Sequence, residues 1–255
     1  MDQGERRQGR RVAGDQRQAR SVARRRRTQR EARILAASKP LLVIFDCDGV
    51  LVDSEPIAAH HTALAVSELG WAMTTAEAKR EFLGDTHANI VRRIEERIGR
   101  PVPPDWVERT QSRFFAALEH QLEPVPGVLT AIEALRAAGV TLAVGSQGSH
   151  EKMRLTLRVT GLLPLFEGRI FSASQVSRPK PWPDLFLLAS ETLGFTPEQT
   201  VVVEDSTRGV KAALAAGMRI FGYTGSVGAD AMAAAGAELI DNLAELPHRL
   251  GIPTP

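Results

Sequence analysis

The chain has a single cysteine, Cys47, among its 255 residues. One cysteine excludes an internal disulfide and suits a reducing compartment, so we expect a cytoplasmic protein. No stretch approaches the roughly 18 uninterrupted apolar residues of a membrane span, and no apolar core of a signal peptide is visible. We therefore expect no membrane partner. Hydrophobic residues still make up 43% of the chain, which is enough to bury a sizeable core.

Acidic residues are scarce in the first part of the chain. Residues 1–38 hold twelve arginines and four acids, a net +8, whereas the rest of the chain carries −6 within the overall +2. Such a composition cannot offset the entropy of ordering, so residues 1–38 are predicted to be a disordered basic tail. An arm that binds nucleic acid is an alternative, but no aromatic residue lies among these arginines and we do not expect nucleic acid as a partner. An arginine-rich transit peptide is a second alternative.

The most informative segment, residues 41–55, reads LLVIFDCDGVLVDSE. It predicts a short buried strand that ends in Asp46 and Asp48. Ligands of open α/β sheets bind beyond the carboxyl ends of the strands, and acids at i and i+2 leave a strand on the same side. Burying unpaired carboxylates is costly, and a cation such as Mg²⁺ would explain them; a loop of exposed acids is the alternative. Cys47 should point to the opposite face as a small buried residue.

The remaining pattern predicts an α/β fold with a doubly wound parallel sheet and an inserted helical block. Apolar residues at helical spacing predict helices at 58–69, 75–82, 88–98 and 104–122. Beyond a linker at 124–127, helices and strands alternate. We expect helices at 127–138, 150–159, 184–193 and 208–216, and strands at 140–145, 169–172, 200–205 and 218–222.

Three further segments place polar residues directly after apolar runs or prolines. They are VTLAVGS at 140–146, which ends in Ser146; RPKPWPDLF at 178–186, which contains Lys180; and TVVVEDS at 200–206, which contains Glu204 and Asp205. Alone, a serine after a strand is usually a helix cap, and a lysine is usually a solvated charge. Together with DCDG, the segments resemble, in order, the four motifs of the haloacid dehalogenase (HAD) superfamily. The resemblance continues through TRGVKAALAAGM at 207–218.

Within that superfamily, the chain resembles the β-phosphoglucomutase and phosphoglycolate phosphatase branch, whose members carry a helical cap. The resemblance implies a Rossmann-like HAD core at 39–54 and 125–255 and an α-helical cap domain at 55–124. Hinges near Ser54 and Pro124 would let the cap close over the site.

The resemblance also implies a phosphoric monoester hydrolase that works through an aspartyl-phosphate. Asp46 would be the nucleophile, and Asp48 the general acid and then the general base. Ser146 would hydrogen-bond a phosphoryl oxygen, and Lys180 would place its charge against Asp46 and the phosphate.

The expected cofactor is Mg²⁺. By resemblance, Asp46, Asp205 and the backbone carbonyl of Asp48 would hold the ion, with Glu204 behind it or bound to it through water. A dehalogenase on the same fold is disfavoured, because attack at carbon needs no metal, and a carboxylate facing Glu204 and Asp205 would be repelled without a cation.

A phosphosugar mutase remains an alternative function. Mutase-type relatives carry a histidine where this chain has Ala58, and a lysine and an arginine where residues 83–87 read LGDTH. Without those groups a second phosphate would be held weakly, which favours hydrolysis. Gln147 stands where asparagine is common, and we expect no loss from the similar amide. A non-catalytic binding protein on the same fold is the other alternative, although every motif position holds a competent residue.

The expected partner is a small phosphorylated metabolite. A sugar phosphate, phosphogluconate, phosphoglycolate and pyrophosphate are all compatible with the sequence. We expect the protein to be a monomer or a weak dimer.

Overall fold

The computed structural model describes residues 41–82, 85–225 and 228–252, all within one compact unit, Leu41–Pro255. The predicted basic tail, 1–38, lies outside the described residues, as do Leu83 and Gly84. None of the helices in the described ranges has the length and apolar character needed to cross a bilayer.

A six-stranded parallel sheet forms the centre of the fold, in the order β3-β2-β1-β4-β5-β6. The strands are β1 (Leu42–Phe45), β2 (Thr141–Ser146), β3 (Ile170–Ser172), β4 (Thr200–Glu204), β5 (Arg219–Tyr223) and β6 (Glu238–Ile240). The predicted doubly wound parallel sheet is therefore confirmed. Because β2 and β4 flank β1 on opposite sides, the sheet has its switch point at β1, where ligands bind in such folds.

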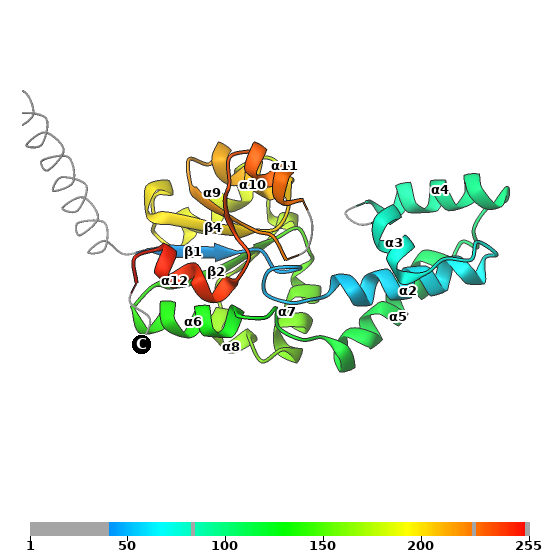
Figure 1. Cartoon of the computed structure of the whole chain (residues 1–255), viewed down its shortest axis with the longest axis horizontal. Helices are drawn as coiled ribbons and strands as arrows, with labels where there is room; N and C mark the ends of the chain where they lie inside the picture. Colours follow the sequence, from blue (N-terminus) through cyan, green and yellow to red (C-terminus); the bar gives the residue numbers. More distant parts are fainter. Residues whose placement is uncertain (1–40, 83–84, 226–227, 253–255) are drawn as a thin grey trace, which may run out of the picture. The chain divides into compact units, whose positions relative to one another are not determined.

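Helices cover both faces of this sheet (Figure 1). The helices of the described residues, including those of the insertion, are α2 (Glu55–Glu68), α3 (Thr75–Phe82), α4 (His87–Ile98), α5 (Trp106–Gln121), α6 (Val128–Ala137), α7 (His150–Val159), α8 (Leu163–Phe166), α9 (Asp184–Thr192), α10 (Thr207–Ala215), α11 (Ala229–Ala234) and α12 (Leu246–Arg249). Short 3₁₀ turns are η1 (Ala173–Gln175), η2 (Pro197–Gln199) and η3 (Leu243–Glu245). Helices α6, α7, α8 and α12 pack on one face, and α9, α10 and α11 on the other.

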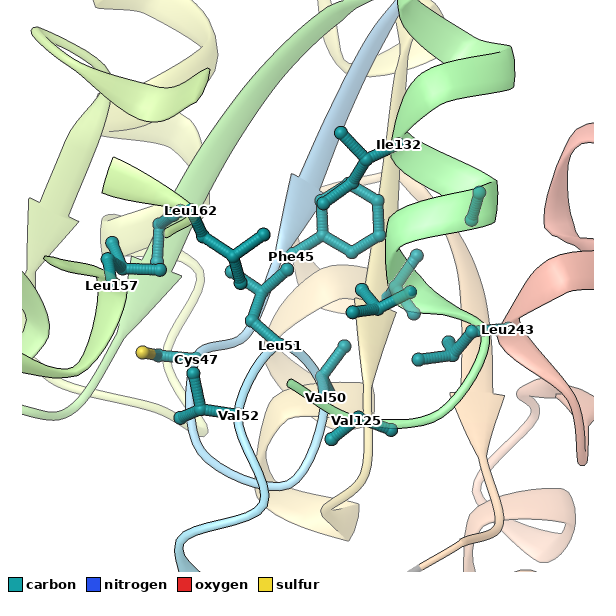
Figure 2. Packing of buried hydrophobic residues seen from close by; sticks show 14 of the residues in the cluster. Phe45, Cys47, Val50, Leu51, Val52, Val125, Ile132, Leu157, Leu162 and Leu243 are labelled. Carbon is teal, nitrogen blue, oxygen red and sulfur yellow. The ribbon is translucent and has the colours of Figure 1, made fainter. Parts of the chain in front are cut away.

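Strand β1 is buried on both faces, as its unbroken LVIF sequence predicts. Val43 and Phe45 pack into the cluster under α6 and α7, whereas Leu42 and Ile44 pack into the cluster under α9 and α10. Figure 2 shows Phe45 together with Ile132 of α6 in the first cluster. Each such side chain contributes about 1.5–3 kcal/mol by burial, so the strand that carries the first motif is firmly anchored.

The predicted orientation of Cys47 agrees with this packing. Cys47 is buried in the first cluster (Figure 2), and its Sγ lies 3.6 Å from the Oγ1 of Thr156 on α7. A tight turn then reverses the chain, with Gly49 at φ 76° and its N–H donating to the carbonyl of Val52 at 2.9 Å. Only glycine adopts this conformation readily.

Helices α2–α5, which we call the insertion, have a hydrophobic cluster of their own. It contains Val66, Phe82, Ile94 and Trp106, whose indole N–H donates to the carbonyl of Ala65 at 3.2 Å. The two ends of the insertion nevertheless join the sheet's core, through Ile57 at the start of α2 and through Ala117 and Leu118 near the end of α5.

The two chain segments that connect the insertion to the sheet lie side by side. Val52 pairs with Pro124, and the Asp53 N–H donates to the carbonyl of Glu123 at 3.0 Å. These are the segments in which the sequence places the hinges. That residues 55–124 act as a separate, closing cap domain stays a prediction.

Candidate active site

A cavity of about 680 Å³ lies at the carboxyl ends of the central strands. All six residues singled out in the sequence line it: Asp46, Asp48, Ser146, Lys180, Glu204 and Asp205. Asp46 and Asp48 follow β1, Ser146 ends β2, and Glu204 and Asp205 end and follow β4. Because these strands are parallel neighbours, their carboxyl ends share one edge of the sheet.

Lys180 joins the ends of three strands at the floor of this cavity. Its buried ammonium group donates to Asp46 Oδ1 at 2.6 Å, to Glu204 Oε1 at 2.6 Å and to the carbonyl of Gly145 at 2.8 Å. An ammonium has three N–H donors, so all of them are used. The carbonyl of Lys180 in turn accepts from the guanidinium of Arg208 at 3.0 Å, which ties this loop to α10.

Burial has the largest effect on the pKa values of Asp46 and Lys180. Burial raises the pKa of Asp46 to about 7; the ammonium of Lys180 opposes this shift, and the charges of Glu204 and Asp48 add to it. Burial by itself would lower the pKa of Lys180, but its contacts with Asp46 and Glu204 outweigh that effect and raise the pKa. Lys180 is therefore a fixed positive charge between two carboxylates.

Glu204 is held by donors from its own strand end. Its Oε2 accepts from the backbone N–H of Asp205 at 3.0 Å and of Ser206 at 2.9 Å, and from the Ser206 hydroxyl at 2.8 Å. Helix α10 packs so closely here that a Cβ at Gly209 would overlap the Glu204 carboxylate. Both carboxylate oxygens of Glu204 are thus bound by protein donors, which turns the side chain toward Lys180.

Asp48 is half-buried, and each of its carboxylate oxygens accepts a hydrogen bond. The hydroxyl of Ser54 donates to Oδ1 at 2.6 Å, and the ammonium of Lys152 donates to Oδ2 at 2.8 Å. Ser54 belongs to the segment that enters the insertion, and Lys152 lies in the first turn of α7. The ammonium of Lys152 also lies 5.7 Å from the ring centroid of Phe114, on α5 of the insertion.

Ser146 is buried at the end of β2, and its Oγ accepts from the backbone N–H of Gly148 at 3.2 Å. This contact uses the oxygen as an acceptor and leaves the hydroxyl proton to donate. Asp205 lines the cavity one residue beyond Glu204.

Sequence reasoning missed Lys152, Arg208 and the residues that the insertion contributes to the cavity. The signal for Lys152 is its position at the start of the helix that follows the second motif, since helix N-termini after parallel strands lie at the same edge as the strand ends. His61 of α2 also lines the cavity. Burial lowers its pKa, and its Nε2 has no hydrogen-bond partner among the described residues.

In the part of the chain that the structure describes, no three His, Cys, Asp or Glu side chains are arranged as a metal-binding group. Lys180 occupies the position between Asp46 and Glu204, so the predicted metal residues do not all converge on one point. Oxygen donors are nevertheless present on Asp46 and Asp205, and these are the atoms that Mg²⁺ prefers.

A doubly wound sheet with buried carboxylates and a lysine at its switch point places charged groups where ligands bind in such folds. Residues 43–223 match the family described as haloacid dehalogenase-like hydrolase, and the chain belongs to that family. The predicted family and the predicted hydrolase class are confirmed.

Relatives of the chain include phosphatases. Phosphorylated carbohydrates phosphatase of Thermotoga maritima is 32% identical over 199 residues, covering 72% of this chain and 86% of that protein. The 6-phosphogluconate phosphatase of Escherichia coli is 28% identical over 180 residues, covering 70% and 80%. Among solved structures, a HAD family hydrolase from Deinococcus radiodurans with bound phosphate and sodium has a TM-score of 0.75 and 36% identity, covering 85% of this chain and 99% of that one.

Proposed function

We propose that the protein is an Mg²⁺-dependent phosphatase that hydrolyses a small phosphorylated metabolite through an aspartyl-phosphate on Asp46. The observation that carries the proposal is the contact between Asp46 and Lys180, at 2.6 Å, beside Asp48 in one cavity. The names of the relatives, which include phosphatases of phosphorylated carbohydrates and of 6-phosphogluconate, support the same reaction class.

In the first step, a carboxylate oxygen of Asp46 attacks phosphorus and the bond from phosphorus to the ester oxygen breaks. Asp48 gives its proton to the leaving oxygen, which departs as an alcohol. In the second step, Asp48 takes a proton from a water molecule, which attacks the same phosphorus and releases phosphate and the Asp46 carboxylate. Ser54 and Lys152, on the two oxygens of Asp48, fix the orientation of that carboxylate between the steps.

Ser146 binds the phosphoryl group, and Lys180 acts on it through its charge. The Ser146 hydroxyl proton is directed to a phosphoryl oxygen while the Gly148 N–H holds its oxygen. Lys180 keeps a positive charge against the reacting carboxylate, where transferring groups gain most from fixed charges. Glu204 orients Lys180.

The charges of the cavity fit a divalent cation. On the sheet side it is lined by four carboxylates, those of Asp46, Asp48, Glu204 and Asp205, against the cationic groups of Lys152, Lys180 and Arg208. A phosphate ester adds up to two more negative charges. Oxygen atoms of Asp46 and Asp205 and the carbonyl of Asp48 would hold Mg²⁺, with Glu204 behind them. The bound ion would screen the repulsion between the carboxylate and the phosphate.

The charged residues that line the cavity do not favour the mutase alternative. On the insertion, Lys79 lines the cavity, but its ammonium pairs with Glu55 at 3.3 Å. Of the LGDTH stretch, Asp85, Thr86 and His87 line the cavity, while Leu83 and Gly84 lie outside the described residues. A second phosphate would therefore meet no unpaired lysine or arginine among the described residues of the insertion that line the cavity.

The experiment follows phosphate release from p-nitrophenyl phosphate with Mg²⁺, with EDTA, and with EDTA followed by excess Mg²⁺. We expect activity that EDTA removes and Mg²⁺ restores. Asp46→Asn should abolish it, because an amide cannot carry the phosphoryl group, and Asp48→Ala should lower turnover by roughly 10² to 10⁴. Asp230→Asn, an exposed change on α11, is the matched control. Turnover by Asp46→Asn within a few-fold of wild type would refute the assignment of the nucleophile.

A further inference from the structure

A second, small cavity of about 60 Å³ adjoins the main one inside the insertion. We call it the distal pocket. Thr62 of α2, His87 of α4, and Thr110 and Gln111 of α5 supply its polar lining, and all four also line the main cavity. The distal pocket therefore shares part of its lining with the cavity that contains Asp46.

The polar groups of the distal pocket can both donate and accept hydrogen bonds. The Thr62 hydroxyl makes no hydrogen bond to another described residue, and the Thr110 hydroxyl donates to the carbonyl of Trp106 at 2.8 Å, which leaves its oxygen to accept. The side-chain amide of Gln111 lies 3.4 Å from His87 Nδ1. Hydroxyl and amide groups of this kind match a ligand hydroxyl, which also gives and accepts.

Charge is missing from the described lining of the distal pocket, which has no Asp, Glu, Lys or Arg. A carboxylate or a phosphate placed there would lose water without gaining the fixed charge of a lysine or an arginine, which disfavours it. Lys79, the lysine of the insertion that lines the main cavity, is paired with Glu55 at 3.3 Å. The distal pocket therefore selects against a second anionic group.

Size and shape limit the group further. A cavity needs roughly 10–15 Å³ to hold one water molecule, so the distal pocket, at about 60 Å³, has room for about four to six heavy atoms, the size of a short hydroxyl-bearing carbon unit. Ile90 and the buried Trp106 form an apolar wall, against which the C–H face of such a group can pack. The indole N–H of Trp106 is bound to Ala65, which fixes the ring in place.

We infer that the distal pocket binds the uncharged, hydroxyl-bearing end of the leaving group, so that the substrates are sugar or polyol monophosphates. Esters whose far end is a carboxylate or a second phosphate are poor substrates. This inference rests on the phosphatase function proposed above.

The test compares two six-carbon substrates that differ only at the far end. Sorbitol 6-phosphate ends in a hydroxymethyl group, and 6-phosphogluconate ends in a carboxylate. We expect kcat/KM to favour sorbitol 6-phosphate by about 10- to 100-fold, because an unpaired buried charge costs at least as much as a lost hydrogen bond. The Kd values of both compounds for Asp46→Asn, measured by calorimetry, should show the same order without turnover. Equal or reversed preference would overturn the inference.

A matched pair of variants assigns the preference to the distal pocket. Gln111→Arg places a cation in the pocket and should shift the kcat/KM ratio at least about tenfold toward 6-phosphogluconate. Gln121→Arg, at the exposed end of the same helix, adds the same charge outside the pocket and should leave the ratio unchanged. Equal shifts from both variants would mean that general charge, and not the distal pocket, sets the preference, which would refute the inference.

p-Nitrophenyl phosphate, which has no sugar or polyol end, distinguishes failure of the distal-pocket inference from failure of the proposed phosphatase function. Mg²⁺-dependent and Asp46-dependent release of nitrophenol, combined with preference for 6-phosphogluconate, would refute the distal pocket alone. Absence of phosphate release from every ester, including p-nitrophenyl phosphate, would refute the phosphatase function, and the inference would fall with it. Thr62→Val should lower kcat/KM for sorbitol 6-phosphate about three- to tenfold relative to p-nitrophenyl phosphate, the effect of one lost hydrogen bond.

Discussion

Lys180→Met tests whether the buried ammonium group stabilises the fold as well as the reaction. The substitution keeps an unbranched chain but leaves Asp46, Glu204 and the carbonyl of Gly145 without the donor that binds all three. Removing one partner of a buried ion pair costs about 3–5 kcal/mol, because the remaining charge stays buried without compensation. A domain of this kind has about 5–15 kcal/mol of stability in total, so we expect a folded but strongly destabilised variant.

The stability that Lys180→Met loses should increase as the pH rises. Burial already raises the pKa of Asp46 to about 7 in the presence of Lys180, and removing the ammonium raises it further. An acid with a raised pKa in the folded state holds its proton more tightly there than in the unfolded chain. The free energy of unfolding therefore falls as pH rises from about 4, the ordinary pKa of aspartate, through and beyond 7. The variant should be closer to wild type at about pH 5 than at about pH 8.

The measurement is urea denaturation in metal-free buffer at both pH values. Lys211→Met, an exposed change on α10, is the control and should stay within about 0.5 kcal/mol of wild type. A deficit for Lys180→Met below about 1 kcal/mol at the higher pH, or a larger deficit at the lower pH, would refute the reasoning, since either result means that the two carboxylates do not depend on Lys180.

Three further substitutions probe other contacts. Gly209→Ala should lower the free energy of unfolding by about 1–3 kcal/mol in thermal denaturation, because its Cβ would overlap Glu204. Lys152→Met should reduce kcat for p-nitrophenyl phosphate roughly tenfold with a smaller change in KM, since Asp48 loses one of its two orienting contacts; Lys152→Arg should recover part of the loss. Ile94→Ala, in the buried cluster of the insertion, should cost about 2–5 kcal/mol in urea denaturation.

Each of these three predictions has a control variant or a result that would contradict it. Gly148→Ala is the control for the glycine, because a Cβ there meets its neighbours at ordinary distances of 3.7 Å or more; equal destabilisation of both variants would contradict the argument. An unchanged kcat for Lys152→Met would mean that Lys152 does not orient Asp48 for catalysis. A urea denaturation curve for Ile94→Ala that overlays that of wild type would mean that the insertion adds nothing to the measured transition.

The sequence sufficed to find the four acids and the serine that line the sheet side of the cavity, because each of them stands at or close to the end of an apolar run. Parallel strands bring their carboxyl ends to one edge, so the order of motifs alone places Asp46, Ser146 and Glu204 together. Lys180 is different, since it lies in a loop before α9 and enters the site through a long side chain. Only its resemblance to a family motif identified it.

Side-chain direction is what the sequence could not supply. Glu204 and Asp205 are adjacent acids, and spacing does not say which of them turns to a lysine and which toward a ligand. The structure decides for Glu204 through the donors of Ser206 and the close approach of Gly209. Lys152 was missed for the same reason, because its contact with Asp48 spans 104 residues of chain. Elements beyond residue 223 were missed because α11 is a short alanine-rich turn and β6 has three residues.

The distal pocket shows why substrate choice is harder to predict than reaction type. The reacting groups follow strands, whose common edge is set by the hydrophobic pattern of each strand. Thr62, His87 and Gln111 lie on three helices whose relative positions depend on how Val66, Ile94 and Trp106 pack in the insertion. A threonine or glutamine at such a position has no local pattern that distinguishes it from a solvated surface residue. On the inference drawn above, packing between helices selects the leaving group, and a substitution such as Gln111→Arg should change the preferred substrate while the motifs proposed to perform the reaction stay the same.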